Sequence, residues 1–457
     1  MSLKFVTSIG VALAMAFAHW AVYGAGPVGS EPRPFGKESP GYRAPLGPAM
    51  DPAEPIAEPT GALTLREALA LALKANPELG AFSREIRARE AAVLQARLLP
   101  NPELSITSEN LGNAVLKDID GPQTTVSLSQ LILLGGKRVR GIEVMGFDRD
   151  LAAWDYETKR MDVLTRVAQA FVEVLRTQEG LALANDLAAL AERVVEAVSA
   201  RVRAGKVSPV EETRAQVTLA SVKIEQARAV RELEAARKRL GATWGSTTLR
   251  FKTVQGKLDQ VLPIPTLEKL IQRLTQNPDL ARWATELAQR QATIDLERSR
   301  AIPDLTVSLG VTQFTDTNDS ALVAGVSIPL PVLNRNQGNI QAAHQRFTRA
   351  MEERHAAEVS VTTALNTAYQ SLTAAHIEVT TLKTQVLPGA QSAFEAVSRG
   401  YRLGKFGFLD VLDAQRTLFG AKAQYLQVLA SYHQAVAEVE RLIGELIQAA
   451  RSLEESR

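Results

Sequence analysis

The stretch Pro102-Glu103-Leu104-Ser105-Ile106 recurs later in the chain as Pro303-Asp304-Leu305-Thr306-Val307. Three further landmarks repeat in the same order at a separation of about 200 residues. They are Asn76-Pro77 with Asn277-Pro278, Val126-Ser127 with Val326-Ser327, and Gly205-Lys206 with Gly404-Lys405. Because all four keep one order and one spacing, they indicate an internal duplication. We expect the two structural repeats to span residues 63–262 and 263–449.

Each repeat follows the same order of elements. A short helix stops at the Asn-Pro, a second helix runs on to a proline, and two strand-like segments follow, near 103–131 and near 304–330. In the second repeat Leu305 and Val307 alternate with the polar Thr306. Segments of about ten residues with one apolar and one polar face are typical of transmembrane strands. A half-buried soluble hairpin gives the same local pattern, so the segments alone leave both readings open.

A long helix and a return helix complete each repeat. Residues 137–204 contain no proline and carry apolar residues at spacings of three and four, which predicts one helix of roughly 100 Å. Its return helix is expected at 209–241. The second repeat is expected to have helices at 337–403 and 408–448, with a kink at Pro388-Gly389. The predicted fold class is therefore mainly α, built from long helical hairpins.

Four strands cannot close a barrel in a membrane, because at least eight are needed and open strand edges are excluded from lipid. A membrane role would require several copies to pool their strands. Three copies would supply twelve, although this argument requires an oligomer without fixing the number at three.

The beginning of the chain has the parts of a secretory signal peptide. Lys4 precedes an apolar run that ends in small residues, which predicts a signal peptide over 1–25. A retained membrane anchor is the alternative reading. Residues 26–62 are rich in proline and are expected to form an extended N-terminal tail, and 450–457 a C-terminal tail.

Composition excludes several classes of function. The 457-residue chain has 52 Lys plus Arg against 50 Asp plus Glu, so no nucleic acid partner is expected. It has no cysteine, which removes disulfides, thiolate metal sites and a lipid-modified cysteine. None of the histidines pairs with another at helical spacing, and His433 lies on an apolar helix face, so no tight metal site is expected. Gly135-Gly136-Lys137-Arg138 lacks the upstream glycine and the Ser/Thr of a phosphate loop. We expect neither an enzyme nor a bound cofactor.

The ordered set of motifs resembles the TolC-type outer-membrane efflux family over nearly the whole mature chain. The supporting residues are both Asn-Pro breaks, 99–104, Gln130 followed by 135–138, and 400–405 followed by 409–415. The resemblance implies a trimeric channel with four strands per protomer. These strands would form a 12-stranded β-barrel in the cell outer membrane, continued by a periplasmic α-barrel.

Within that family, the Pro-Asn-Pro-Glu-Leu strand entry and 204–209 look most like the cobalt-zinc-cadmium resistance branch. The resemblance implies passive conduction of divalent heavy-metal cations such as cobalt, zinc and cadmium to the exterior. The implied partners are two further copies, outer-membrane lipid, a periplasmic adaptor and an inner-membrane pump of the resistance-nodulation-division (RND) class. A channel for drug efflux or type I secretion is an alternative. A soluble periplasmic coiled-coil scaffold or adaptor is an alternative of another class.

The resemblance implies a pore gate at Asp410 and Asp413, which share one face at the start of a helix. In the family this Asp-x-x-Asp forms acidic rings at the periplasmic mouth, whereas the residues alone favour a complement to the helix dipole. Arg214 stands where the second repeat has Asp413, which predicts a salt bridge between neighbouring helices. Tyr401 matches a tyrosine that ties the closed tip in relatives, while Phe406 replaces the basic partner expected there.

The turns between long and return helices are the expected adaptor-docking tips. They contain Gly205 and Lys206 in the first repeat and Gly404 and Lys405 in the second. The residues that follow the first turn, Ser208-Pro209-Val210-Glu211, have the pattern of a capping box, which predicts that Glu211 caps its own helix.

Overall fold

The computed structural model describes residues 58–110 and 121–445. The expected signal peptide, the tail up to residue 57 and the C-terminal tail lie outside these residues. The first repeat contains β1 (Gly61–Thr64), α2 (Leu65–Ala75), α3 (Pro77–Arg97), β2 (Glu103–Glu109), β3 (Gln123–Ile132), α4 (Lys137–Arg203), α5 (Pro209–Ala242) and β4 (Phe251–Gln255). The second contains α6 (Leu267–Arg273), the 3₁₀ turn η1 (Leu274–Gln276), α7 (Pro278–Arg300), β5 (Leu305–Phe314), β6 (Ser320–Ser327), α8 (Gln337–Thr381), the π-helical turn η2 (Leu382–Val386), α9 (Leu387–Arg402) and α10 (Phe408–Ile443).

Both Asn-Pro motifs begin one helix and hold the end of another. The side-chain oxygens of Asn76 and Asn277 each accept a hydrogen bond from the backbone N–H three residues on, at 3.0 and 3.2 Å. Each side-chain Nδ2 donates to a carbonyl at the end of its own repeat's return helix. Asn76 binds Thr243 and Asn277 binds Leu442, both at 2.7 Å. Both asparagines are buried, so each uses both ends of its amide away from water.

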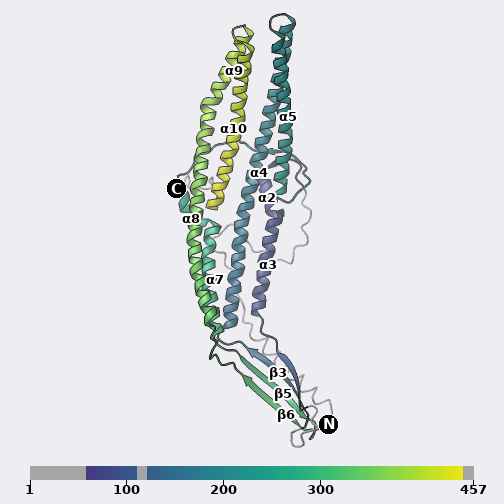
Figure 1. Cartoon of the computed structure of the whole chain (residues 1–457), viewed down its shortest axis with the longest axis vertical. Helices are drawn as coiled ribbons and strands as arrows, with labels where there is room; N and C mark the ends of the chain where they lie inside the picture. Colours follow the sequence, from purple (N-terminus) through teal and green to yellow (C-terminus); the bar gives the residue numbers. More distant parts are fainter. Residues whose placement is uncertain (1–57, 111–120, 446–457) are drawn as a thin grey trace. The chain divides into compact units, whose positions relative to one another are not determined.

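These contacts place short helices end to end with return helices. Helices α3 and α5 both pack along α4, and α7 and α10 both pack along α8 (Figure 1). Helix α10 also packs against α4, which joins the two repeats. The main core lies where the end-to-end joints meet the long helices, and it includes the fully buried Leu240, Leu270, Leu372 and Leu442.

Four strands form an antiparallel sheet in the order β2-β3-β5-β6. Strand register puts Leu104 opposite Leu128, which lies opposite Leu309. One face is consequently apolar, because facing residues on neighbouring strands share a side of the sheet. It carries Leu104, Ile106, Val126, Leu128, Val307, Leu309, Val311, Leu322, Ala324 and Val326.

The opposite face of this sheet carries mainly hydroxyl groups and glycines, with Leu131, Phe314, Ala321 and Val323 among them. It carries Ser105, Thr107, Thr125, Ser127, Ser129, Thr306, Ser308, Gly310, Thr312, Gly325 and Ser327. Thr125 and Thr312 hydrogen-bond through their hydroxyls at 2.8 Å. At Gly310 a Cβ atom would lie 2.7 Å from the Val126 carbonyl oxygen, so the sheet leaves no room for a larger residue there.

A second, two-stranded sheet was not expected from the sequence. Strand β1 pairs in parallel with β4, and Leu63 and Phe251 are both 0% exposed. Gln178 of α4 binds the Val254 backbone through both ends of its amide, at 3.2 and 3.4 Å. The end of the proline-rich segment is therefore a strand from Gly61 onward, because it finds an edge to pair with.

Two helix boundaries differ from expectation for local reasons. The break in the second long helix is the π turn η2, which precedes Pro388 rather than coinciding with it. A proline removes one N–H donor and its ring crowds the preceding turn, so the distortion falls on the N-terminal side. Helix α10 ends at Ile443 because Gly444 adopts a φ of 73°, which terminates the helix in a left-handed cap.

The Gly-Gly-Lys-Arg motif forms the joint between sheet and helix. Asp304 Oδ1 accepts hydrogen bonds from the Leu134 N–H at 2.9 Å and from Lys137 Nζ at 2.6 Å. The ion pair ties the start of α4 in the first repeat to the start of β5 in the second. Gly136 precedes α4 with a φ of 73°, and Asn336 takes the same place before α8 with a φ of 58°.

Candidate functional site

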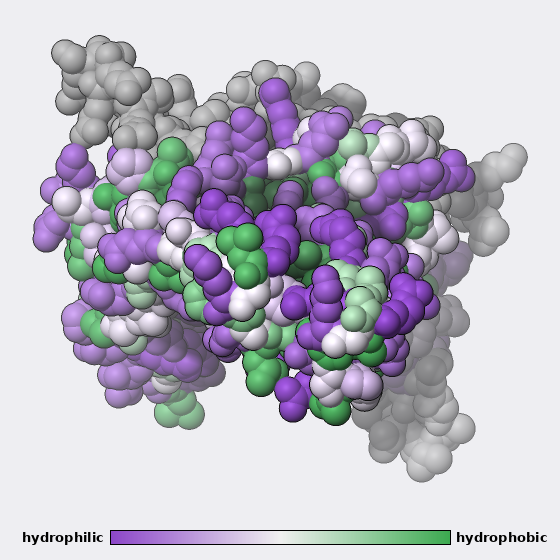
Figure 2. Space-filling model, turned by 90° about the horizontal axis from the view of Figure 1, so that it is seen from above, coloured by the Kyte–Doolittle hydropathy of each residue, from purple (hydrophilic) through white to green (hydrophobic). Residues whose placement is uncertain are grey.

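The two helical turns have the same backbone geometry. At the first, the Gly205 N–H binds the Val202 carbonyl and the Lys206 N–H binds the Arg201 carbonyl, both at 2.9 Å. At the second, Gly404 and Lys405 repeat this pattern at 3.0 and 2.8 Å. Both glycines have positive φ, 67° and 75°, as this helix-ending motif requires. Figure 2 views the structure from this end and shows mainly hydrophilic side chains with hydrophobic ones scattered among them.

Asp410 caps the helix that follows the second turn. Its carboxylate accepts a hydrogen bond from the Gly407 N–H at 2.8 Å, and the side chain is exposed. Asp413 lies one turn further along and is also exposed. The two carboxylates therefore stand on one exposed face near the turn, with no basic side chain paired to either within residues 58–110 and 121–445.

The cap of the return helix in the first repeat differs from the expectation. Ser208 Oγ accepts from the Val210 N–H at 3.3 Å, but Glu211 does not complete a capping box. Its Oε2 is buried without a hydrogen-bond partner in the described part of the chain. The prediction that Glu211 caps α5 is therefore wrong. Its charge acts instead on Tyr401 of the neighbouring hairpin, whose pKa is raised by burial and also by Glu211.

Arg214 and Asp413 do not meet within one copy. Arg214 is exposed, and none of the ion pairs among the described residues includes it. A salt bridge between these two residues remains a prediction about contacts between helices of different copies.

Tyr401 makes the contact that joins the two hairpins near their tips. The Arg201 guanidinium of α4 lies over the Tyr401 ring of α9, 4.4 Å from its centroid. The Tyr401 ring also lies 6.1 Å from that of Phe408 at the start of α10. Burial raises the pKa of the Tyr401 hydroxyl, which therefore stays protonated. Sequence reasoning missed Arg201, whose only signal was its position one turn before the end of a long helix.

Phe406 has a structural role in the second turn. Its ring covers the backbone of Gly400, where an added Cβ would fall within 2.2 Å of Phe406 Cδ2, and Gly400 is buried. The aromatic residue that replaces the family's basic partner consequently packs back on its own hairpin.

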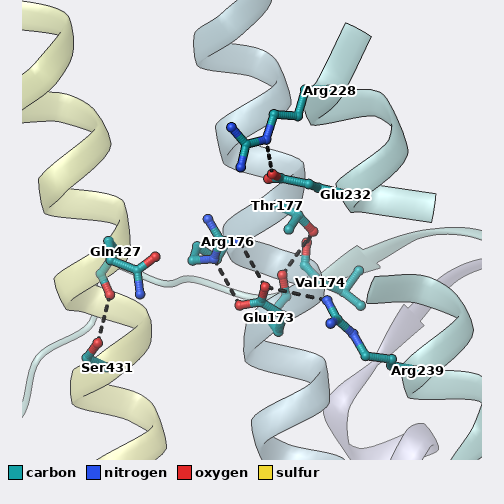
Figure 3. Close-up of polar contacts among 9 residues, drawn as sticks. All are labelled: Glu173, Val174, Arg176, Thr177, Arg228, Glu232, Arg239, Gln427 and Ser431. Atoms are coloured by element: carbon teal, nitrogen blue, oxygen red, sulfur yellow. Dashed lines mark hydrogen bonds and ion pairs between the residues drawn. The ribbon is translucent and has the colours of Figure 1, made fainter. Parts of the chain in front are cut away.

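A groove of about 540 Å³ runs between α4, α5 and α10. Its lining includes Leu183, Leu187, Leu412, Phe419 and Leu426 together with charged residues from α4 and α5. Figure 3 shows these charges as pairs. Glu173 contacts Arg176 at 2.8 Å and Arg239 at 3.8 Å, and Arg228 contacts Glu232 at 3.0 Å. The Arg176 hydrogen bonds lower the pKa of Glu173, so this carboxylate stays charged beside the groove.

The apolar face of the four-stranded sheet is exposed within one copy. Leu104 is 67% exposed, Leu322 71% and Val326 72%. The opposite face is less accessible only at its centre, where Gly310 is buried and Thr312 is 5% exposed. A contiguous apolar surface of this kind marks contact with lipid or with another protein.

None of the helices in the described residues is long and apolar enough to cross a membrane. The described residues contain no cluster of three or more metal-ligating side chains. His433 packs beside Tyr432 with its Nε2 2.8 Å from the Leu258 carbonyl oxygen, and burial lowers its pKa.

Comparison with known proteins gives consistent matches along the chain. A family model described as outer membrane efflux protein matches residues 68–246 and 270–445, one stretch in each repeat. The cobalt-zinc-cadmium resistance protein CzcC of Cupriavidus metallidurans is 41% identical over 398 residues, which cover 87% of this chain and 94% of CzcC. The nickel-cobalt-cadmium resistance protein NccC of Alcaligenes xylosoxydans xylosoxydans is 27% identical over 295 residues, covering 64% and 65%.

The fold matches solved structures as well. The outer membrane protein VceC from Vibrio cholerae superposes with a TM-score of 0.69 at 17% identity, over 84% of this chain and 96% of VceC. This likeness confirms the fold class, and the family match confirms the resemblance drawn from the motifs. The chain belongs to the outer membrane efflux protein family.

Proposed function

We propose that this chain is the outer-membrane channel of a tripartite efflux system and conducts divalent heavy-metal cations passively from the periplasm to the exterior. The observation that carries the proposal is the 41% identity to CzcC over 94% of that protein, whose name specifies cobalt, zinc and cadmium. NccC, which is more distant, shares cobalt and cadmium in its name. The family consists of transport proteins, and we assign this chain no catalytic step and no cofactor.

The channel is proposed to be a homotrimer. Strands β2 and β6 are the two edges of the four-stranded sheet, and each offers unpaired backbone groups on one side. Lipid cannot satisfy those groups, so the edges must pair with other copies. Three copies joined edge to edge give a closed barrel of twelve strands with no free edge.

Internal duplication supports the same arrangement for the helices. Within one copy, α10 of the second repeat packs on α4 of the first. Helix α5 is the counterpart of α10, and it exposes a stripe of Val210, Val217 and Ile224, which are 56%, 62% and 67% exposed. We place α8 and α9 of the next copy on this stripe, since α8 is the counterpart of α4. A head-to-tail contact of this kind generates a ring when its rotation closes, as the proposed three-copy barrel requires.

The faces of the sheet fit a barrel wall. The exposed apolar face is assigned to lipid and the hydroxyl face to the lumen. Hydroxyl oxygens offer hydrated cations weak contacts, so the lumen would pass ions without holding them.

The periplasmic mouth is proposed to be gated at Asp410 and Asp413. In a trimer they would supply six carboxylates around a narrow opening, where they attract cations and repel one another. The contact between Arg201 and Tyr401 would keep the two hairpins of each copy together in the closed state. Arg214 is proposed to pair with an acid of the neighbouring copy.

The helical turns are proposed as the docking tips for a periplasmic adaptor, which connects the channel to an inner-membrane RND pump. Both turns expose a lysine, Lys206 and Lys405, directly after the positive-φ glycine. Exposed turns of fixed backbone shape offer a partner the same surface on each hairpin.

The proposal is tested by deleting the gene and measuring growth on cobalt, zinc and cadmium salts. We expect sensitivity to at least two of these metals, restored by the wild-type chain. A deletion strain as resistant as its parent would refute the metal assignment. Sensitivity to drugs alone would support the drug-efflux alternative. Extraction of the chain as a soluble monomer without detergent would support the scaffold alternative.

A further inference from the structure

The ion pair at the sheet–helix joint fastens one repeat to the other. Lys137 and Asp304 are 13% and 23% exposed and 2.6 Å apart. They meet because β3 ends where β5 begins, with Ile132 opposite Leu305. Strand β3 thus brings Lys137 to Asp304, the residue that precedes β5.

Duplication gives each partner a counterpart elsewhere in the chain. Gly136 and Asn336 are equivalent, since both have positive φ and directly precede a long helix. Gln337 is therefore the counterpart of Lys137. Glu103 is the counterpart of Asp304, because each follows the proline that precedes a strand. These counterparts lie at opposite edges of the sheet, since Glu103 opens β2 and Gln337 follows β6.

Counterparts at opposite edges can meet only between copies. If β6 of one copy lies antiparallel to β2 of the next, the end of β6 adjoins the start of that β2. This repeats the relation of β3 to β5 within one copy. The joint after β6 then faces Glu103 of the neighbouring copy.

The cation at this second joint is supplied by a different residue. Gln337 is neutral, and it is engaged locally, accepting from the Arg335 N–H at 2.8 Å and donating to the Leu333 carbonyl at 3.2 Å. Arg335 is exposed, and its guanidinium donates to the Val332 carbonyl at 3.5 Å. Glu103 is likewise exposed. Neither charge takes part in an ion pair among the described residues.

Apolar side chains flank both charges. On the β6 side Leu330 is 78% exposed and Leu333 88%, and on the β2 side Leu99 is 52% and Leu104 67% exposed. Packing these surfaces together would remove water from around the charges and strengthen their attraction.

We propose that Arg335 of one copy forms an ion pair with Glu103 of the next, within an apolar contact between segments 328–335 and 98–104. This contact repeats between copies what Lys137 and Asp304 do within one copy. The inference rests on the proposed trimer and names the residues that close it at the sheet–helix joint.

Cross-linking tests the contact directly, because the chain has no cysteine to interfere. In the double variant Glu103→Cys, Arg335→Cys, treated with a short bismaleimide, we expect covalent dimers and trimers on a denaturing gel. Mixing the two single variants should give covalent dimers only. The matched control Lys137→Cys, Asp304→Cys should react within one chain and run as a monomer. Native trimers of the double variant that give no covalent dimer would overturn the proposal.

Charge reversal supplies a second test without cysteines. Glu103→Arg and Arg335→Glu should each lower the fraction of trimers surviving mild heating in detergent by roughly tenfold, and the double reversal should restore most of it. A double variant no better than either single variant would also overturn the pair. A wild-type chain that is monomeric in detergent would refute the trimer, whereas trimers that conduct but show no rescue would refute only this contact.

Discussion

The two helical hairpins follow one plan but differ in the continuity of their long helices. Helix α4 runs for 67 residues without interruption, whereas its counterpart is divided by the π turn η2 and by Pro388. The second hairpin therefore has the weaker backbone hydrogen bonding at mid-length, and it is the hairpin that carries Asp410 and Asp413. We therefore expect the first hairpin to be a rigid strut, meaning that its long helix resists bending, and the second hairpin to bend more easily.

The two return helices also differ in the residue that caps their first turn. A neutral hydroxyl, that of Ser208, caps α5, whereas the carboxylate of Asp410 caps α10. The two turns share one backbone geometry, but different side chains cap the helices that follow them. The proposed gate residue and the helix cap coincide in the second repeat only.

The largest expected effect on stability comes from placing a proline in α4 at the position equivalent to Pro388. Ala189 is the exposed counterpart of Pro388. Ala189→Pro should destabilise the folded protein by about 3 kcal/mol or more, because α4 loses a hydrogen bond and gains a clash. Thermal unfolding in detergent, followed by circular dichroism, measures this. The reverse change Pro388→Ala should raise the midpoint. A loss below about 1 kcal/mol for Ala189→Pro would contradict the strut interpretation.

The next effect concerns the asparagines that hold the return helices. Asn277→Ala removes a helix cap and leaves the Leu442 carbonyl without its buried donor, which should cost about 2–3 kcal/mol. Asn76→Ala should cost somewhat less, since Asn76 is 7% exposed and Asn277 1%. Asn277→Ser keeps the cap and loses only the donor, so its unfolding midpoint should fall between those of wild type and Asn277→Ala. Equal midpoints for Asn277→Ala and wild type would show that the joint does not matter.

A smaller effect is expected on ion selectivity at the mouth. The double change Asp410→Asn, Asp413→Asn should lower the cation-to-anion permeability ratio several-fold in planar bilayers, because it removes the proposed rings of charge. Glu211→Gln is the matched control at the equivalent place in the first repeat and should leave the ratio unchanged. A ratio that responds equally to both changes would assign the selectivity to overall charge and remove the distinction between the hairpins.

The smallest effect is a dependence of stability on pH at the start of α3. Arg166 binds both carboxylate oxygens of Glu78 at 2.8 Å, and its hydrogen bonds lower the pKa of Glu78 to about 2. Since the pKa is lower in the folded state, the pair stabilises the fold above pH 4.5 and loses that contribution as the pH falls toward 2. The Glu78 side chain is 45% exposed, so screening should keep the contribution below about 1 kcal/mol.

Glu78→Gln should therefore flatten the stability profile between those pH values, as unfolding midpoints at a series of pH values would show. Arg166→Gln should flatten the profile less, because Lys159 still pairs with Glu78 at 3.1 Å. A profile that Glu78→Gln leaves unchanged would show that the pair contributes nothing measurable.

The main elements of the fold followed from local signals in the sequence. Proline, glycine and Asn-Pro positions mark helix ends through backbone chemistry, and strand alternation predicts which face of the sheet is apolar. The features that could not be predicted depend on contacts between segments far apart in the sequence. The amide of Asn277 binds Leu442, and the guanidinium of Arg201 stacks on Tyr401, although nothing in their local sequence indicates these partners.

The candidate site was predictable in part for the same reason. The glycine turns and the two exposed aspartates are local features, and the structure places both aspartates just after the second turn. The direction of the Glu211 side chain was mispredicted because a capping pattern competes with packing between hairpins. Strand β1 was not predicted because its partner β4 is about 190 residues away in the sequence.

The pairing of β1 with β4 bears on the order in which the chain is made. The two strands are about 190 residues apart, and the whole first hairpin lies between them. Strand β1 leaves the ribosome first but has no edge to join until α4 and α5 have been synthesised. Closing so long a loop is slow, so the small sheet should form late and seal the first repeat only once its hairpin is in place. Formation of this sheet would thus be the step that completes the core of the first repeat.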